Sequence, residues 1–468
     1  MLACDKDSKG NALEVANSLY ETGLFEAVEP IFLSLTLDTP NDPLFSNQWN
    51  LQHTGQYGYS GFDIKYIQAS NANLIPSTGN VIVGVIDSGI ELTHTDISLA
   101  SFNWNVFTSS SNGATYTSHG TNVAGILTGI TNNSIGIAGV TSNAGKAMSI
   151  TAIDSNNILE WEDASVAIKK ATDQGASVIN CSWSGGTSNY LVEQAIYYAL
   201  TNGRDGKGCV ITCAAGNKNG GSLRYPASHT PEKEVIAVGG ISYNGKRKDY
   251  YTPDGETTWG SNYGTNLDIV APCVKIPTTT IGNSWITNFN GTSSATPQVS
   301  GVAALMLAWN PNLSYDEVGQ ILKITANKSL PGYTFSNSTY GTWNNEVGYG
   351  LLNMYAALDM AKNTSYYTYG NNMYFDGGQT TLNSGGSGYV GTTFTAYPNN
   401  NNYNYYWSGS YTGTCDRWFV TPNTPYSSIG NVSVYLNPGQ SGVLTVTCRV
   451  YSNTAYIGKI TQYVYVSY

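Results

Sequence analysis

The stretch Val81–Ile90 reads VIVGVIDSGI, and it is the segment that decides the fold. An uninterrupted run of apolar and small residues, rich in β-branched side chains, leads to Asp87. Such a run predicts a strand buried on both faces, as in a parallel sheet covered by helices. Reactive groups of open α/β sheets collect at the carboxyl ends of the strands, where Asp87 stands. The segment predicts an α/β fold with an acid at that edge, although an aspartate in this position could also serve a turn.

A histidine begins the next informative pattern, Ser118–Ile126, which reads SHGTNVAGI. The small residues after His119 predict a helix that can pack closely against its neighbours. His119 could be an ordinary surface histidine. The chain has only four histidines, however, which makes a chance coincidence with the Asp87 motif less expected.

A serine stands at the start of a third pattern, Asn290–Pro297, which reads NGTSSATP and precedes the apolar run Val302–Leu307. This arrangement predicts that Ser293 lies at a helix N-terminus. Free backbone N–H groups and the positive end of the helix dipole favour negative charge there, so a serine can be activated for attack. Taken alone, the stretch could equally be a helix cap, because serine and threonine are common at caps.

The chain order Asp87, His119, Ser293 is the order of the catalytic residues in subtilisin. All three motifs resemble the subtilase family of serine proteases, and the resemblance covers about residues 43–360. A fourth motif, VITCAAGN, ends at Asn217, where the family has an asparagine that donates to the oxyanion. The resemblance implies a three-layer α/β sandwich with a mainly parallel sheet, and a serine endopeptidase that acts on proteins or peptides.

The resemblance also implies a role for each of these four residues. His119 takes the proton of Ser293 and later gives it to the leaving amine, while Asp87 orients the imidazole. Asn217 and the backbone N–H of Ser293 stabilise the tetrahedral oxyanion. Loss of one such donor typically lowers turnover by ~10²–10³.

The stretch Ile179–Gly186, INCSWSGG, matches the family strand that pairs with the substrate backbone. The resemblance implies that four consecutive residues bind substrate: Ser182, Trp183, Ser184 and Gly185. Ser184 stands where the family usually has glycine, and Trp183 could equally be core packing. Lys218, which follows Asn217, would disfavour lysine or arginine in the primary pocket.

A calcium site is also implied by the resemblance. Asp96 follows Asp87 by nine residues, and the loop TNNSIGI at residues 131–137 contains Asn133. In subtilases of this pattern the acid and the second asparagine bind Ca²⁺ within an oxygen cage, which this hard cation prefers. We expect Asp96 and Asn133 to be ligands, with a weaker contribution from Gln48. Asp96 and Asn133 could instead be turn residues.

Charge and hydropathy limit the possible partners. The formal net charge is -10 and only 11% of residues are charged, with no basic patch that would indicate a nucleic-acid or anionic-membrane partner. No apolar run approaches the ~18–20 residues of a membrane helix. Cys181, Cys209, Cys213 and Cys273 lie in or beside apolar strands, which predicts buried thiols rather than metal ligands.

Residues 1–42 are unusually acidic, with eight acids and two lysines, a net of -6 that leaves -4 for the remainder. Asn11–Gly23 predicts a helix closed by glycine, and Leu24–Pro30 alternates as a strand. A helix followed by a strand here resembles the second half of a subtilase propeptide, so we expect a zymogen that cuts itself between about Pro30 and Pro43. The first propeptide half is missing, which suggests that the sequence begins internally. The alternative is a structural N-terminal extension.

Composition changes after residue 362, and residues 363–468 are rich in Tyr, Asn, Gly, Ser and Thr. Short alternating stretches between turn signals predict an antiparallel sandwich, loosely similar to immunoglobulin-like or PKD-like modules. Its tyrosines could bind carbohydrate or protein. Cys415 and Cys448 could bridge two strands or remain free.

We therefore divide the chain into a propeptide remnant with linker (1–42), a peptidase domain (43–362) and a β-sandwich module (363–468). The expected protein is a secreted or cell-surface serine endopeptidase. The alternative is an adhesion protein that uses an inactive protease domain as a scaffold.

Overall fold

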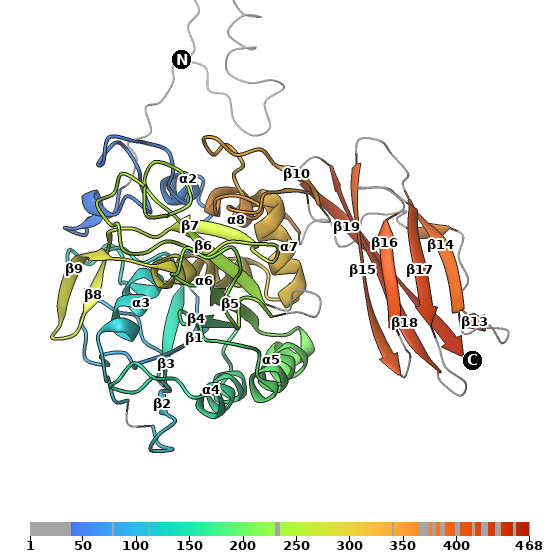
Figure 1. Cartoon of the computed structure of the whole chain (residues 1–468), viewed down its shortest axis with the longest axis horizontal. Coiled ribbons are helices and arrows are strands. Elements are labelled where there is room, and N and C mark those ends of the chain that lie inside the picture. Colours follow the sequence, from blue (N-terminus) through green and yellow to red (C-terminus); the bar gives the residue numbers. More distant parts are fainter. Residues whose placement is uncertain are drawn as a thin grey trace, which may run out of the picture. The chain divides into compact units, whose positions relative to one another are not determined.

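The computed structural model describes residues 39–76, 79–111, 113–229, 235–338 and 341–364, and the backbone of the strands between residues 374 and 467 (Figure 1). The predicted propeptide helix and strand, and Cys415, lie outside the described residues. No helix among the described residues is long and apolar enough to cross a membrane.

A seven-stranded parallel sheet forms the middle of the peptidase domain, with the strand order β2-β3-β1-β4-β5-β6-β7. The predicted strand at Val81 is the third in this order. The strands are β1 (Val81–Asp87), β2 (Trp104–Asn105), β3 (Gly145–Thr151), β4 (Val178–Cys181), β5 (Val210–Ala214), β6 (Ile236–Ile241) and β7 (Ile269–Pro272).

Helices cover both faces of this sheet. Side chains of β1 alternate between two apolar layers, with Val83 and Val85 in one and Ile86 in the other. The first layer contains α2 (Tyr66–Asn71), α3 (His119–Thr128), α6 (Thr292–Trp309), α7 (Tyr315–Thr325) and α8 (Met354–Thr364). The second layer contains α4 (Trp161–Asp173) and α5 (Tyr190–Asn202). The α/β sandwich with a mainly parallel sheet is confirmed.

The carboxyl edge of the sheet is where functional side chains gather. Asp87 ends β1, β4 leads into Ser182, and β5 leads into Asn217. The hairpin of β8 (Ile276–Thr280) and β9 (Ser284–Phe289) then delivers the chain to α6. A short hairpin, β10 (Ser336–Ser338) and β11 (Gly341–Trp343), follows later in the chain.

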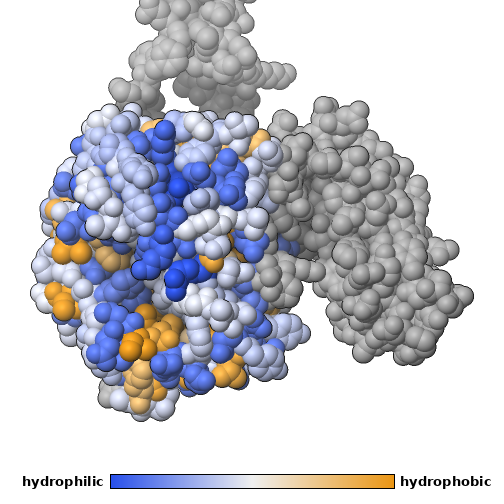
Figure 2. Space-filling view, in the orientation of Figure 1, coloured by the Kyte–Doolittle hydropathy of each residue, from blue (hydrophilic) through white to orange (hydrophobic). Residues whose placement is uncertain are grey.

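The peptidase domain has a mostly polar surface and buried cysteines. Figure 2 shows a mostly hydrophilic face on which apolar side chains occur only in small groups. Cys181, Cys209, Cys213 and Cys273 are buried free thiols, as the sequence predicts.

The C-terminal strands pair in two four-stranded sheets, ordered β12-β14-β17-β16 and β13-β19-β18-β15. All pairings are antiparallel except that of β13 with β19. The predicted immunoglobulin-like sandwich, its ligand and the Cys415–Cys448 bridge stay predictions. The strands are β12 (Tyr374–Asp376), β13 (Thr381–Asn383), β14 (Tyr389–Tyr397), β15 (Tyr403–Gly413), β16 (Arg417–Pro422), β17 (Ile429–Tyr435), β18 (Ser441–Ser452) and β19 (Ala455–Ser467).

Candidate active site

An aspartate and a histidine from different elements meet at the carboxyl edge of the sheet. Asp87, at the end of β1, is fully buried, and the backbone N–H of Ser88 donates to its Oδ1 at 2.7 Å. His119, the first residue of α3, places its Nδ1 2.8 Å from Asp87 Oδ1 and 3.0 Å from Oδ2. The carboxylate therefore fixes the orientation of the ring and leaves Nε2 facing away from Asp87.

The environment of His119 favours its protonated form. Burial by itself lowers the pKa of the imidazole, because it penalises the charged ring. The negative charge of Asp87 and the hydrogen bond to it act in the opposite direction, and together they outweigh burial. The net effect raises the pKa of His119 above its ordinary value of 6.5. A base with such a pKa binds and releases protons near neutral pH.

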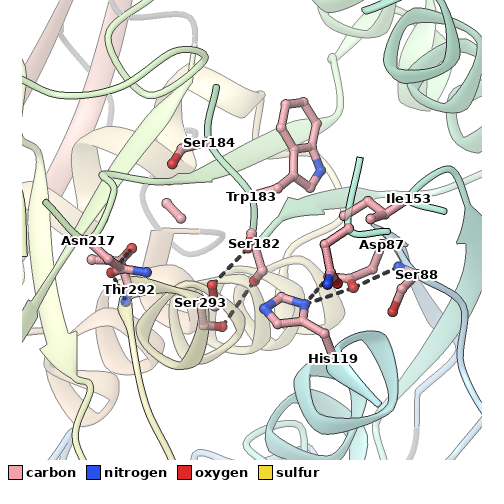
Figure 3. A pocket seen from close by; sticks show the side chains of 12 residues that line it. Asp87, Ser88, His119, Ile153, Ser182, Trp183, Ser184, Asn217, Thr292 and Ser293 are labelled. Carbon is pink, nitrogen blue, oxygen red and sulfur yellow. Dashed lines mark hydrogen bonds and ion pairs between the residues drawn. The ribbon is translucent and has the colours of Figure 1, made fainter. Parts of the chain in front are cut away.

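Ser293 lies on the other side of the imidazole (Figure 3). It is the second residue of α6 and 9% of its surface is exposed. Its hydroxyl donates to the backbone carbonyl oxygen of Ser182 at 2.9 Å, rather than to His119. A rotation about its Cα–Cβ bond redirects the hydroxyl, and catalytic hydrogen bonds often form only when substrate is bound.

Asn217 is oriented by the residue before the serine. Its Oδ1 accepts from the backbone N–H of Thr292 at 2.9 Å and from the Thr292 hydroxyl at 3.0 Å. The amide nitrogen therefore remains available to donate. Gly291 has a φ of 107°, and a Cβ on it would lie 3.1 Å from Asn217 Nδ2. The glycine is thus required both by its backbone conformation and by the close approach of this amide.

These residues surround a cavity of about 260 Å³. Asp87 and His119 are the only lining residues with an acidic or basic side chain. Away from the Asp87–His119 pair, the cavity therefore presents neutral walls to a substrate side chain. It is lined by Asp87, Ser88, His119, Ile153, Asn157, Ser182, Trp183, Ser184, Ala214, Asn217, Thr292 and Ser293.

The predicted substrate strand is only partly in the cavity. Ser182, Trp183 and Ser184 line it, but Gly185 does not. The backbone N–H of Gly185 donates to the carbonyl oxygen of Tyr225 at 2.7 Å. The carbonyl oxygen of Gly185 accepts from Arg224 Nε at 2.9 Å. Both polar groups of Gly185 therefore have partners within the protein.

Several lining residues were not identified from the sequence. Ile153 lies just beyond the end of β3 and Ala214 ends β5, so both stand at the sheet edge that the Asp87 motif indicates. Lys218, predicted to influence the pocket, is exposed and does not line the cavity.

Two buried carboxylates flank the loop of residues 131–137. Asp42 is 3% exposed and its Oδ2 accepts from the backbone N–H of Asn132 at 3.0 Å. Asp96 is fully buried and accepts from Asn133 Nδ2 at 2.8 Å and from the Ile137 N–H at 3.0 Å. The predicted pair of Asp96 and Asn133 is thus brought together, and Asp42 joins it from far away in the sequence. The predicted domain boundary after residue 42 falls within this packed segment.

The electrostatics of this carboxylate pair favour a cation. Burial raises the pKa of Asp96, and the charge of Asp42 raises it further, whereas its N–H donors lower it. None of the described ion pairs brings a basic side chain to either carboxylate. Gln48, the weaker predicted ligand, has its amide oxygen and nitrogen bonded to the backbone of Ala138, each at 2.8 Å.

Comparisons with known proteins agree with the site. Residues 78–350 match the model of the subtilase family, peptidase S8. The chain is 32% identical to a thermophilic serine proteinase of Bacillus sp. (strain AK1) over 350 residues, 75% of this chain and 76% of that protein. It is 32% identical to thermitase of Thermoactinomyces vulgaris over 57% of this chain and 85% of that one.

A solved protease structure from Pseudoalteromonas arctica PAMC 21717 is similar, with a TM-score of 0.54 and 26% identity. The match covers 69% of this chain and 99% of the solved one. The family model spans more than half of the sequence, and its residues include the whole cavity described above. The chain therefore belongs to the subtilase family and is a subtilisin-like serine endopeptidase.

Proposed function

We propose that Asp87, His119 and Ser293 form the catalytic triad of this endopeptidase. His119 removes the Ser293 proton as the oxygen attacks the substrate carbonyl carbon, and then protonates the departing amine. The resulting acyl-enzyme is hydrolysed by water, which His119 activates in the same way. The observation that carries the proposal is the Asp87–His119 pair, which holds the ring in one orientation with Ser293 in the same cavity.

The oxyanion of the tetrahedral intermediate is stabilised by Asn217 and by the backbone N–H of Ser293. Asn217 Oδ1 accepts from the N–H and the hydroxyl of Thr292, so the amide nitrogen is left to donate in the cavity. This arrangement supports the role. Ser182, Trp183 and Ser184 bind the substrate residues before the cut. The neutral lining favours an uncharged side chain in the primary pocket.

Reaction with a fluorophosphonate tests the assignment, since only an activated serine is modified. The unmodified protein should be labelled at Ser293 and should cleave peptides. Ser293→Ala should abolish labelling and leave only the ~10³–10⁴-fold acceleration over water that binding and the oxyanion hole supply. The matched control is Ser294→Ala, which removes a buried hydroxyl bonded to Gly291. Near-normal turnover by folded Ser293→Ala would refute the triad. An unmodified protein that neither labels nor cleaves peptides would instead favour the alternative of an inactive adhesion scaffold.

We also propose that Asp42, Asp96 and Asn133 hold Ca²⁺. Two buried carboxylates beside a loop rich in carbonyl and amide oxygens suit a hard cation. A half-turn of the Asn133 amide would give up the bond from the Ile135 N–H to its oxygen and would present that oxygen in place of the nitrogen that now meets Asp96. Bound calcium would supply positive charge between the carboxylates and stabilise the native state by mass action.

We further propose that the enzyme is secreted or held at the cell surface and is made as a zymogen. The acidic segment before Asn41 would act as a removable inhibitor, cut at a position after about residue 30. Because Asn41 and Asp42 are bonded to the loop of residues 131–137, the cut should leave both attached to the peptidase domain.

N-terminal sequencing tests this maturation. Active enzyme should begin between about residues 31 and 41, whereas Ser293→Ala should retain Met1. An intact Met1 on enzyme that labels fully with fluorophosphonate would contradict the zymogen proposal.

A further inference from the structure

A continuous chain of hydrogen bonds runs beneath Ser293. It begins in β5 with Thr212, crosses to Ser300 in α6, and continues through Asn180 in β4 to Ser182. Thr212, Ser300 and Asn180 have no exposed surface, and Ser182 is 2% exposed. Four polar side chains from three elements therefore meet inside the domain, directly below the cavity.

The distances give this chain a direction. Ser300 donates to Asn180 Oδ1 at 2.8 Å, so its oxygen is left to accept from Thr212, 2.6 Å away. Asn180 Nδ2 donates to Ser182 Oγ at 2.9 Å. The Ser182 hydroxyl donates in turn to the carbonyl oxygen of Ser293 at 3.1 Å. Because every donor points the same way, each bond polarises the next one.

Competing acceptors are farther away. The carbonyl oxygen of Ile179 lies 3.5 Å from Thr212 Oγ1, and that of Thr296 lies 3.2 Å from Ser300 Oγ. Each is longer than the bond to the next side chain of the series. The direction toward Ser293 is therefore the better satisfied arrangement.

Ser182 and Ser293 are joined twice. The hydroxyl of Ser182 donates to the carbonyl of Ser293, and the hydroxyl of Ser293 donates to the carbonyl of Ser182 at 2.9 Å. During catalysis the second bond must break, because the Ser293 proton passes to His119. The first bond can persist, and it then holds the Ser293 main chain, including the N–H that faces the oxyanion.

We propose that Ser300 and Asn180 are positioning residues for Ser293. They act through Ser182, which they hold in the rotamer that bonds the Ser293 carbonyl. The inference rests on the proposed catalytic role of Ser293. Small displacements of a reacting group are costly to the rate, so a loosened support should lower turnover more than substrate binding.

The test uses the full-length protein and a peptide amide substrate, for which attack by the serine limits the rate. Active sites are counted by fluorophosphonate titration, and melting temperature is measured for every variant. Ser300→Ala removes the donor to Asn180 and should lower kcat about tenfold, with KM changed by less than about twofold. Ser300→Thr retains the hydroxyl and should recover most of the rate.

Thr212→Val breaks the chain one bond farther from Ser293 and should lower kcat about threefold. Its matched control is Thr325→Val, because Thr325 is also buried and its hydroxyl donates to the Ile321 carbonyl of α7 at 2.7 Å. The control should lose similar thermal stability with unchanged kcat. If Ser300→Ala does not fold, the comparison of these two threonine variants decides.

Two results would overturn the proposal. An unchanged kcat in folded Ser300→Ala and Thr212→Val, with a lowered melting temperature, would show that this series of hydrogen bonds serves stability alone. A raised KM with unchanged kcat would assign it to substrate contacts instead. Failure of the triad itself is seen separately, as an unmodified protein that fluorophosphonate does not label.

Discussion

Asp87 and Asp96 lie nine residues apart and are both fully buried, yet they have opposite kinds of partner. Asp87 faces an imidazole that can carry a positive charge. Asp96 accepts from N–H donors, one of them the indole of Trp285 at 2.8 Å, and the carboxylate of Asp42 raises its pKa. Burial alone therefore does not reveal what a carboxylate does.

The difference has an electrostatic meaning. The negative charge of Asp87 is balanced whenever His119 is protonated, which is the state that forms during acyl transfer. The charge of Asp96 has no such partner within the described ion pairs, and burial raises the pKa of its carboxyl. A buried charge of this kind is costly unless a cation neutralises it. We therefore expect changes at Asp87 to affect turnover and changes at Asp96 to affect stability.

The largest expected effect comes from Asp87→Asn. The amide keeps the shape of the side chain but can no longer orient and stabilise the imidazolium, so kcat should fall by ~10⁴. Activity is measured on a peptide amide after active-site titration. The melting temperature should change much less than the rate. A variant whose melting temperature falls sharply while its specific activity stays near normal would reverse the distinction between the two aspartates.

The second prediction concerns Asp96: removal of calcium should lower the stability of the protein. At a free calcium concentration about 100 times its dissociation constant, the ion adds ~2.7 kcal/mol to the free energy of unfolding. Excess chelator should lower the melting temperature accordingly. Asp96→Asn should reduce that dependence, while kcat at low temperature stays close to normal. A melting curve that does not change in chelator would contradict the calcium site.

The stability of the protein should also depend on pH through Asp96. Because the pKa of Asp96 is raised in the fold, its protonated form stabilises the native state below the ordinary carboxyl value of 3.8. In chelator that contribution should be lost as pH rises through the raised pKa. Excess calcium should suppress the loss, and Asp96→Asn should not show it.

The smallest effect concerns the acidic limb of activity. His119 acts as a base only when neutral, and its pKa lies above 6.5 in the native protein. The rate constant kcat/KM should therefore rise with pH and reach half its plateau above pH 6.5. Asp87→Asn removes the charge that raises this pKa, so the residual activity should have its midpoint at lower pH. An unmoved midpoint would argue that His119 is not the titrating base.

Much of the fold could be predicted because its signals are local. The run before Asp87 is apolar on both faces, and β1 lies within the sheet with helices on both sides. The same local character placed His119 and Ser293 at helix starts, where the structure has them. Fold class and family were therefore readable from short motifs.

Other features depended on contacts between distant segments. The sequence placed Asp42 in a linker, but it packs against a loop 90 residues away. Gly185, a predicted substrate-binding residue, has its backbone bonded to the carbonyl oxygen of Tyr225 and to the Arg224 side chain. No local pattern reports such contacts, because a backbone group can bond either substrate or protein with the same geometry.

The fold class, the family and the residue types required for acyl transfer could be read from short apolar or glycine-rich patterns in the sequence. The partners of the buried polar groups became known only from the packed structure. The Ser293 hydroxyl bonds Ser182, Asp42 accepts from the Asn132 N–H, and Thr212 connects through Ser300 to Asn180. The physical reason is that burial makes every unpaired polar group costly, so partners are set by the packing of whole elements rather than by neighbours in sequence.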